Sequence, residues 1–167
     1  MAEQETDAVA LLVTQHREME ELLRLVATTT DDAEKKSRFV EAADLLTVHI
    51  KSEEEIFYPA AHQARTEDDL LESLEEHLSL KRLLADLLEL EPSEKAFEAK
   101  FKVLKEQAEH HHKEEEEHLF PAVLTLLDAA QRATLGNEML ARQAGLTRLG
   151  QPRNAVSGET ETAAPLK

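Results

Sequence analysis

The chain has 167 residues, which is enough for one domain with a hydrophobic core of its own. Its formal net charge of −16 argues against nucleic acid and anionic membrane surfaces as partners, because both are bound through Lys and Arg. The absence of Cys excludes disulfides, thiolate metal sites and Cys nucleophiles.

The composition is typical of a helical protein. Leu, Ala, Glu and Lys dominate, whereas aromatic residues make up only 4% of the chain and Gly occurs four times. The sequence contains no apolar run long enough to span a bilayer and no signal-peptide pattern. We therefore expect an all-α cytoplasmic protein without a membrane partner.

Apolar residues and His recur at alternating spacings of three and four, which is typical of the buried seam of an antiparallel helical bundle. The first predicted helix is capped by Asp7 and ends within residues 28–32, where β-branched and capping residues cluster. The second begins near Ala33 and contains Pro59, at which we expect a kink or a ragged helical end.

The third predicted helix is capped by Thr66 and ends at Pro92. The fourth begins near Ser93, and Pro121 within it repeats the role of Pro59. Together with the first two, these helices would give four long segments joined by short loops, which is the usual arrangement of a four-helix bundle.

A shorter helix follows, with Asp128 as its N-cap, a span of 129–144 and Gly145 as its C-cap. From Thr147 onward the chain is rich in Gly, Pro, Ser, Thr and Glu and lacks periodicity. We therefore predict a bundle with an appended helix over 1–146 and a mobile tail over 147–167.

An internal repeat relates the two halves of the chain. His16 plus 61 is His77. A shift of 62 relates His49, Glu53, Phe57, Tyr58 and Pro59 to His111, Glu115, Leu119, Phe120 and Pro121. Two helical hairpins of one pattern predict an up-down-up-down four-helix bundle.

Six polar residues occupy seam positions that a bundle would normally fill with apolar side chains. They are His16, His49, Glu53, His77, His111 and Glu115. A single core His is usually just a hydrogen-bonded residue, but a repeated set of six would cost several kcal/mol unless its members share a ligand. Imidazole and carboxylate without sulfur suit iron or manganese and can hold zinc. If both Glu bridge two metals and an oxo or hydroxo bridge adds one donor to each metal, about two of the twelve octahedral positions stay open for water, a further side chain or substrate.

The fourth helix offers alternative registers, because His110, His111 and His112 each precede a Glu by four residues. The seam and the repeat both favour His111 with Glu115. The next choice is His112 with Glu116, one step around the helix. In the favoured register, His110 and His112 would flank the site as solvated residues.

Two further residues near the prolines are candidates for the site. His118 lies in the seam seven residues after His111, so it would share that face about 10 Å further along. Tyr58 is the only Tyr, and a regular helix would turn it about half a turn away from His49. A local distortion at Pro59 would bring its phenol inward, where it could act as a ligand, a hydrogen-bond donor or a catalytic group.

These motifs resemble the hemerythrin-like, His-His-Glu cation-binding domains over roughly residues 7–127. The resemblance rests on His16, His49-x-x-x-Glu53, His77 and His111-x-x-x-Glu115, followed by Phe-Tyr-Pro and Leu-Phe-Pro. It implies a four-helix bundle that holds two Fe ions with an oxo or hydroxo bridge. The chain is similar to the bacterial branch with four His and two Glu.

The sequence departs from the oxygen-carrying branch at one place. Those proteins have a second His four residues after the third-helix His, and here that position is Lys81, which we expect to extend to the surface. The loss leaves one iron with an open position and disfavours simple oxygen transport. An open position favours binding and turnover of small oxidants.

Three functions follow as hypotheses. The first is a catalase-like enzyme that breaks down hydrogen peroxide, or a related defence against nitric oxide and oxidative stress. The second is a binding or sensing module for oxygen, nitric oxide or iron, and the third is iron storage or donation. In each case the partners are small molecules, and we expect a monomer or a weak homo-oligomer.

Overall fold

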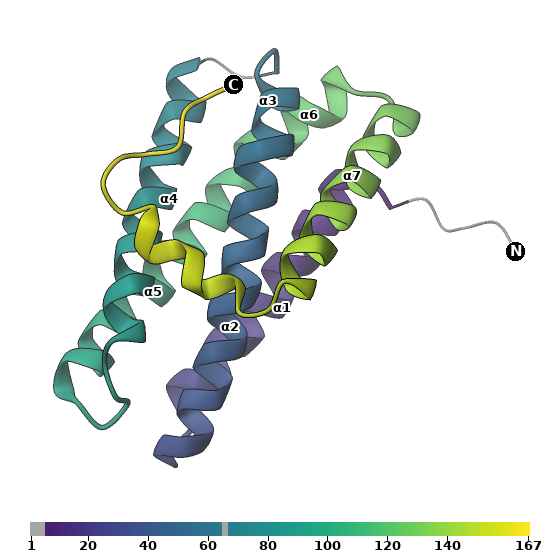
Figure 1. Cartoon of the computed structure of the whole chain (residues 1–167). Coiled ribbons are helices and arrows are strands. Elements are labelled where there is room, and N and C mark those ends of the chain that lie inside the picture. Colours follow the sequence, from purple (N-terminus) through teal and green to yellow (C-terminus); the bar gives the residue numbers. More distant parts are fainter. Residues whose placement is uncertain (1–5, 65–66) are drawn as a thin grey trace, which may run out of the picture.

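The computed structural model describes residues 6–64 and 67–167, and the regular secondary structure of these residues is entirely helical (Figure 1). The elements are α1 (Ala8–Thr28), α2 (Asp32–Ser52), the π-helical turn η1 (Glu53–Phe57), α3 (Tyr58–Ala61), α4 (Glu67–Leu88), α5 (Lys95–Glu114), the π-helical turn η2 (Glu115–Leu119), α6 (Phe120–Leu126), α7 (Ala129–Arg148) and the 3₁₀ helix η3 (Pro152–Gly158). None of the described helices is both long and apolar enough to cross a membrane.

Four long helical segments form the bundle, because α2 continues through η1 into α3 and α5 continues through η2 into α6. Successive segments run in opposite directions, which confirms the predicted up-down-up-down order (Figure 1). The additional helix α7 packs against α1 and α2 on the outside of the bundle.

The predicted N-caps Asp7 and Asp128 are confirmed. Asp7 accepts hydrogen bonds from the backbone N–H groups of the second and third helical residues at 2.9 and 3.1 Å. Asp128 forms a reciprocal capping box with Gln131. The second helix is capped by Asp31, close to the predicted start, and the predicted cap Thr66 lies outside the described residues.

The irregularity predicted at the two prolines takes the form of a π turn. The backbone N–H of Tyr58 bonds to the carbonyl of Glu53, five residues earlier, and Phe120 bonds to Glu115 in the same way. A proline follows directly in each case, and its missing N–H removes a competing α-helical hydrogen bond. A π turn contains one extra residue, so the side chains after it change the face they present.

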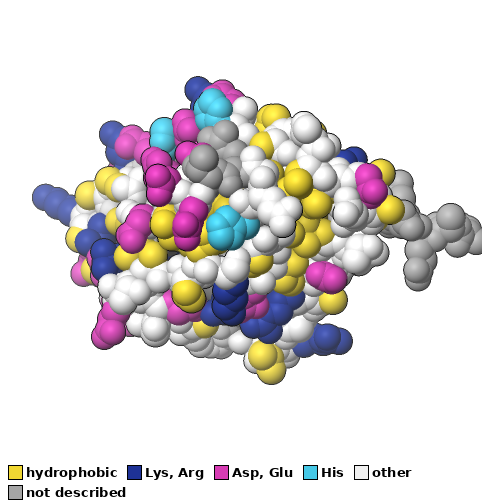
Figure 2. Space-filling view, turned by 90° about the horizontal axis from the view of Figure 1, so that it is seen from above, with side chains coloured by type: hydrophobic (Ala, Val, Ile, Leu, Met, Phe, Trp, Pro, Cys, Tyr) yellow, Lys and Arg dark blue, Asp and Glu magenta, His cyan; other side chains and the backbone are white. Residues whose placement is uncertain are grey.

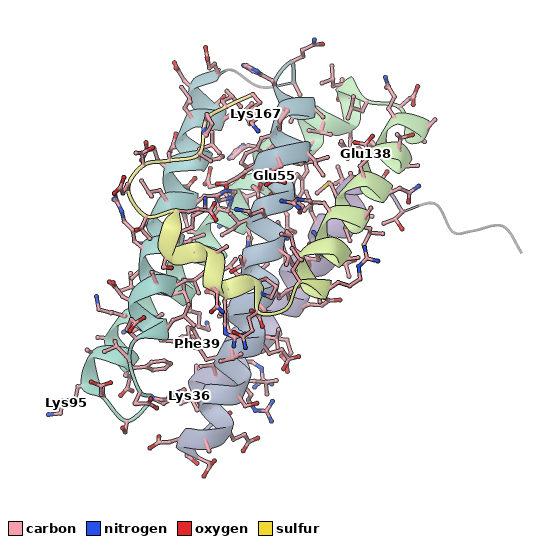
Figure 3. All side chains as sticks on the ribbon, viewed as in Figure 1. Lys36, Phe39, Glu55, Lys95, Glu138 and Lys167 are labelled. Carbon is pink, nitrogen blue, oxygen red and sulfur yellow. The ribbon has the colours of Figure 1, made fainter. Side chains whose placement is uncertain are left out.

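The core consists of two apolar clusters stacked along the bundle. The lower apolar cluster lies at the end of the α1–α2 and α4–α5 loops and contains Met19, Leu23, Leu46, Leu84 and Phe101, among others. Phe39 points into it, whereas Lys36, one turn earlier, is exposed (Figure 3). The upper apolar cluster contains Leu12, Phe57, Leu74, Phe120 and Met139, among others.

The C-terminal residues differ from the mobile tail predicted over 147–167. Helix α7 runs to Arg148 instead of ending before Gly145, and η3 then crosses α2 and α4 (Figure 1). Val156 is 2% exposed in the lower apolar cluster, and Arg153 forms an ion pair with Asp44 at 2.8 Å. The sequence pattern missed this packing because one apolar residue and scattered charges do not produce a periodicity.

Candidate metal centre

A layer of buried polar side chains crosses the bundle between the two apolar clusters. Each member is at most 2% exposed, although burying unpaired polar groups is costly. The members are His16 from α1, His49 from α2, Glu53 from η1, His77 from α4, His111 and His112 from α5, and Glu115 from η2. The structure thus brings together the six residues selected by the seam and the repeat, and it adds His112.

The donor atoms form three groups, two of which share Glu53, while the third joins His16 and His49 to His112. Within each group, the atoms lie within 4.8 Å of one another. The α1 lobe consists of His16, His49, Glu53 and Glu115, and the α4 lobe consists of Glu53, His77 and His111. Because Glu53 belongs to both lobes, its carboxylate lies where it could bridge two metal ions.

The Nδ1 atom of each imidazole in the two lobes faces an acceptor, and the acceptors follow the internal repeat. Gln15 and Glu76 are 61 residues apart, and Glu54 and Glu116 are 62 apart. An Nδ1–H that donates outward leaves the Nε2 lone pair directed at the centre, which is the arrangement of metal-binding His. Hydrogen bonds join His16 to Glu116 at 3.0 Å, His49 to Gln15 at 2.9 Å and His77 to Glu54 at 3.1 Å, whereas Nδ1 of His111 lies 3.4 Å from Glu76 without forming a hydrogen bond.

The inner atoms of the layer lack hydrogen-bond partners. Both carboxylate oxygens of Glu53, Oε1 of Glu115 and the Nε2 atoms of the two α1-lobe imidazoles are buried without one. In the α4 lobe, the Nε2 atoms of His77 and His111 lie 3.0 Å apart, so one of the two rings must carry a proton between them when no metal is bound. Such a set of atoms is suited to binding a cation jointly. The donor set contains no sulfur, which suits iron or manganese.

Without a metal, the layer retains protons. Burial and the charge of Glu53 raise the pKa of Glu115 to about 7. Burial opposes protonation of His77, but the carboxylates of Glu53 and Glu54 outweigh it and raise the pKa of His77 to about 9. Burial, together with the neighbouring imidazoles, lowers the pKa of His112 well below its usual value, so that this ring is neutral.

Tyr58 is fully buried, and its hydroxyl reaches the α4 lobe. It donates to Oε2 of Glu115 at 3.0 Å and lies 3.1 and 3.3 Å from the Nε2 atoms of His77 and His111. A regular α-helix would turn Tyr58 away from the layer. The π turn η1 compensates for this rotation, because it stacks Tyr58 above Glu53 on one face of the segment.

The two lobes differ in the side chains beside them. The repeat position of Tyr58 is Phe120, whose ring stacks 5.7 Å from that of His16. His112 stacks on His16 with ring centroids 3.9 Å apart, and neither of its nitrogens has a hydrogen-bond partner. The repeat places Ile50 where the second half has His112. The α1 lobe therefore has an additional imidazole, and the α4 lobe has a phenol.

The prediction that His112 is solvated is wrong, whereas His110 is exposed as expected. His112 follows the buried Ala108 by four residues and therefore lies on the same side of α5. With His111 on the adjacent seam position, α5 directs two consecutive imidazoles into the core. Their spacing after Ala108 and Leu104 is the sequence signal that could have indicated this.

His118 and Glu116 lie outside the layer. His118 is 54% exposed, and its Nε2 is 3.7 Å from Glu114. Its expected place in the seam is taken by the buried Leu119, because η2 adds one residue to the turn. Glu116 contacts the outer nitrogen of His16 instead of the centre.

The expectation that Lys81 extends to the surface is also wrong. Lys81 is 4% exposed, and its ammonium donates to Glu54 at 2.7 Å and to Glu159 at 3.2 Å. Glu54 in turn contacts Nδ1 of His77. On the opposite side, Arg17 forms an ion pair with Glu116. Glu54 and Glu116 are therefore each paired with a cation that stabilises the position of the carboxylate.

A four-helix bundle that encloses a layer of His and Glu defines a class of metal-binding bundle proteins. Residues 7–123 match the model of the family described as "Hemerythrin HHE cation binding domain", which is well over half of the chain. The chain belongs to this family, and it retains the His and Glu residues on which the resemblance was based.

The chain is similar to two further proteins over different shares of its length. The crystal structure of a hemerythrin HHE cation-binding domain-containing protein from Mycobacterium kansasii, an Rv2633c homologue, is similar with a TM-score of 0.74 and 25% identity, over 96% of this chain and 95% of that one. A DNA nickase of Nostoc sp. (strain PCC 7120) is 29% identical over 106 residues, which is 63% of this chain and 30% of that protein. The chain thus spans less than a third of the Nostoc protein.

Proposed function

We propose that the buried layer binds two iron ions, one in each lobe, with Glu53 and Glu115 as bridges. The observation that carries this proposal is the set of buried imidazole nitrogens and carboxylate oxygens that lack hydrogen-bond partners. In the α1 lobe, the further donors would be His16, His49 and His112, and in the α4 lobe they would be His77 and His111.

The α4 lobe is the proposed binding site for a small oxidant. It has two imidazoles, whereas the α1 lobe has a third within reach, so an iron in the α4 lobe would keep more positions for water or substrate. Lys81 leaves those positions free, because its ammonium is turned toward Glu54. The hydroxyl of Tyr58 lies beside them.

We infer that the reaction is the conversion of two molecules of hydrogen peroxide into one of dioxygen and two of water. The two irons would supply the electron transfer that this reaction needs. The chain itself would hold the reactants in place. Tyr58 fixes Glu115 through its hydroxyl and offers a proton donor in the α4 lobe, and the two apolar clusters exclude bulk water from the layer.

The test is hydrogen peroxide added to iron-loaded protein in an oxygen electrode, with iron content measured in parallel. We expect about two irons per chain and steady oxygen evolution. His111→Ala and Glu53→Ala should abolish both, whereas the exposed matched control His110→Ala should leave both unchanged. Protein purified from iron-replete cells without any bound metal would contradict the proposal.

Tyr58→Phe separates the hydroxyl from the ring. We expect wild-type iron content and a turnover lowered by about 10–100-fold, because the hydroxyl orients Glu115 and donates a proton without being needed to retain the metal. Iron content and oxygen evolution, measured on the same sample, check this. Unchanged turnover would show that the hydroxyl has only a packing role.

A second candidate function, sensing of oxygen, nitric oxide or iron, is favoured by one set of contacts. His77, Glu54 and Lys81 form a chain of contacts that ends at Glu159 in the C-terminal segment. A change at the α4 lobe could thus alter the packing of that segment. A reversible spectral change on oxygenation without turnover would favour sensing, and transfer of iron to an apo-acceptor would favour storage or donation.

The activity named for the Nostoc relative is not carried over to this chain. The match covers 30% of that protein, and a net charge of −16 is unsuited to binding DNA phosphates.

A further inference from the structure

A small pocket opens between α4 and the segment formed by α5 and η2. Its volume is about 70 Å³, which is room for about two water-sized molecules. Its lining includes Glu72, Ser73 and Glu76 from α4, Glu114 from α5, and Glu115 and His118 from η2. The pocket therefore lies on the side of the bundle that carries the α4 lobe.

The inner wall of this pocket belongs to the buried layer. Glu115 is 2% exposed, its Oε1 has no hydrogen-bond partner, and its Oε2 accepts the hydrogen bond from Tyr58. Ser73 also lines this pocket and lies close enough to Tyr58 to counteract the rise in the pKa of that phenol, and Glu76 lies 3.4 Å from Nδ1 of His111. A molecule in the pocket would thus be next to the residues that surround the α4 lobe.

The outer wall is acidic. Glu72 is exposed, Glu114 is 47% exposed and Glu76 is 27% exposed, and the nearest basic group in the lining is His118 beside Glu114. Seen from above, acidic side chains gather on one side of this end of the molecule, with His side chains among them (Figure 2). Carboxylates at a narrow mouth repel anions and leave the approach of neutral molecules unaffected.

A larger hollow of about 740 Å³ between α1 and α5 does not offer the same access. Its lining reaches Arg17 and Glu116, which pair with each other, but it includes no member of the buried layer. Contact with Glu115 therefore distinguishes the pocket at Ser73 as a path to the layer.

We infer that the pocket between α4 and η2 is the access path to the α4 lobe, and that it selects small uncharged molecules such as hydrogen peroxide and nitric oxide over anions and bulky organic hydroperoxides. This inference rests on the proposed iron centre. It specifies the substrate class of that centre through the width of the pocket and the carboxylates at its mouth.

The first experiment closes the path. Ser73→Phe should slow the binding of both nitric oxide and azide to iron-loaded protein by about tenfold or more, because a phenyl ring fills a cavity of this size. Stopped-flow absorbance measures both rates independently of turnover. The matched control Ser73→Ala removes the same hydroxyl but leaves the cavity open, and it should retain wild-type rates.

The second experiment changes the charge of the mouth without changing its size. Glu72→Gln with Glu114→Gln should raise the azide binding rate by about fivefold at low salt and leave the nitric oxide rate unchanged. The control pair Glu75→Gln with Glu117→Gln removes two exposed charges from the same elements outside this lining, and it should change neither rate. Wild-type protein should turn over hydrogen peroxide much faster than tert-butyl hydroperoxide.

The outcomes separate the access path from the proposed function. If Ser73→Phe retains iron and both binding rates stay at the wild-type value, the access path is wrong. If the two mouth variants raise the azide rate equally, selection by these carboxylates is wrong. If the binding rates respond as expected but hydrogen peroxide is not turned over, the path stands and the catalytic function fails. Protein that binds no iron would overturn both.

Discussion

At the residue scale, the two nitrogens of each imidazole in the two lobes point in different directions. Nδ1 faces an outer acceptor, and Nε2 faces the centre. Such outer acceptors fix the orientation of metal ligands and strengthen their binding. The acceptors Glu54 and Glu116 are related by the same shift of 62 as Glu53 and Glu115. The internal repeat therefore extends to the residues that orient the imidazoles.

The pair formed by Lys81 and Glu54 gives the first prediction. Lys81→Met should lower the free energy of unfolding by about 3 kcal/mol, because Glu54 loses the ammonium that balances its buried charge. The affinity of the α4 lobe for iron should fall by about 10–100-fold, because Glu54, the partner of His77, is no longer held in place by Lys81. Urea unfolding and competition with a chelator measure these effects.

The control for this prediction is Lys81→Met combined with Glu54→Gln. It removes both charges and should recover most of the lost stability, although His77 still lacks its carboxylate. Wild-type stability in the single variant would mean that the ion pair does not contribute.

His112 gives the second prediction. His112→Ile introduces the residue found at the repeat position, Ile50, and should fold normally while it weakens metal binding in the α1 lobe. Loss of one imidazole donor should lower that affinity by about tenfold or more. Isothermal titration with ferrous iron measures it, with His110→Ala as the exposed control. Equal affinities in the two variants would exclude His112 as a donor.

At the element scale, the two π turns decide which side chains reach the layer. Each turn begins at a Glu of the buried layer, and a proline is the second residue after its end. In the first half, the turn brings Tyr58 to the α4 lobe, and in the second it brings Phe120 to His16 and turns His118 to the surface. The same kind of π turn thus places a phenol beside the α4 lobe and a phenyl ring beside the α1 lobe.

The C-terminal segment gives the third prediction. Ending the chain after Gly150 should lower the free energy of unfolding by about 2–3 kcal/mol, because Val156 leaves the lower apolar cluster and the contact of Lys81 with Glu159 is lost. Urea unfolding checks this. In the control Glu159→Gln, which keeps residues 151–167, only the contribution of the ion pair with Lys81 to the free energy of unfolding should be lost. If truncation changes nothing, the packing of η3 does not contribute to stability.

At the scale of the whole molecule, the bundle is an apolar core interrupted by one polar layer. Apolar clusters above and below exclude water from this layer, which increases the cost of charges that no metal balances. Metal binding should therefore stabilise the folded chain. The same burial makes the stability of the metal-free protein depend on pH.

The fourth prediction concerns metal-free protein, whose free energy of unfolding should fall as pH rises from 6.5 to about 9. Below pH 6.5, the lowered pKa values of His49 and His112 offset the effect of Glu115. The pKa of Glu115 rises on folding from 4.5 to about 7, so the stability from its protonated form is lost between these values. The pKa of His77 rises from 6.5 to about 9, so the stability from its charged form is present below pH 6.5 and lost as pH rises through about 9.

The expected loss is a few kcal/mol in total, since each group contributes at most about 1.4 kcal/mol per pH unit. Iron-loaded protein should depend less on pH over this range, because metal ions replace the protons. Urea unfolding at a series of pH values, with and without iron, measures both. Metal-free protein that becomes more stable toward pH 9 would contradict the prediction.

The sequence by itself determined the fold class and six members of the buried layer. Seam spacing and the repeat are visible in a linear chain, because a helix converts spacing into a face and a repeat identifies matching positions. His49 with Glu53 and His111 with Glu115 could be recognised in this way. Seam spacing and the repeat also identified one His in each of the first and third helices.

Only the tertiary structure decided where Tyr58, His112, Lys81 and the C-terminal segment lie. Tyr58 faces the α4 lobe because a π turn changes the helical rotation, and regular spacing does not encode that change. Lys81 is buried because its partners Glu54 and Glu159 come from distant parts of the chain. His112 joins the core because α1 packs against it. The burial of Lys81 and of the C-terminal segment depends on contacts between distant segments, which the spacing along one helix does not contain.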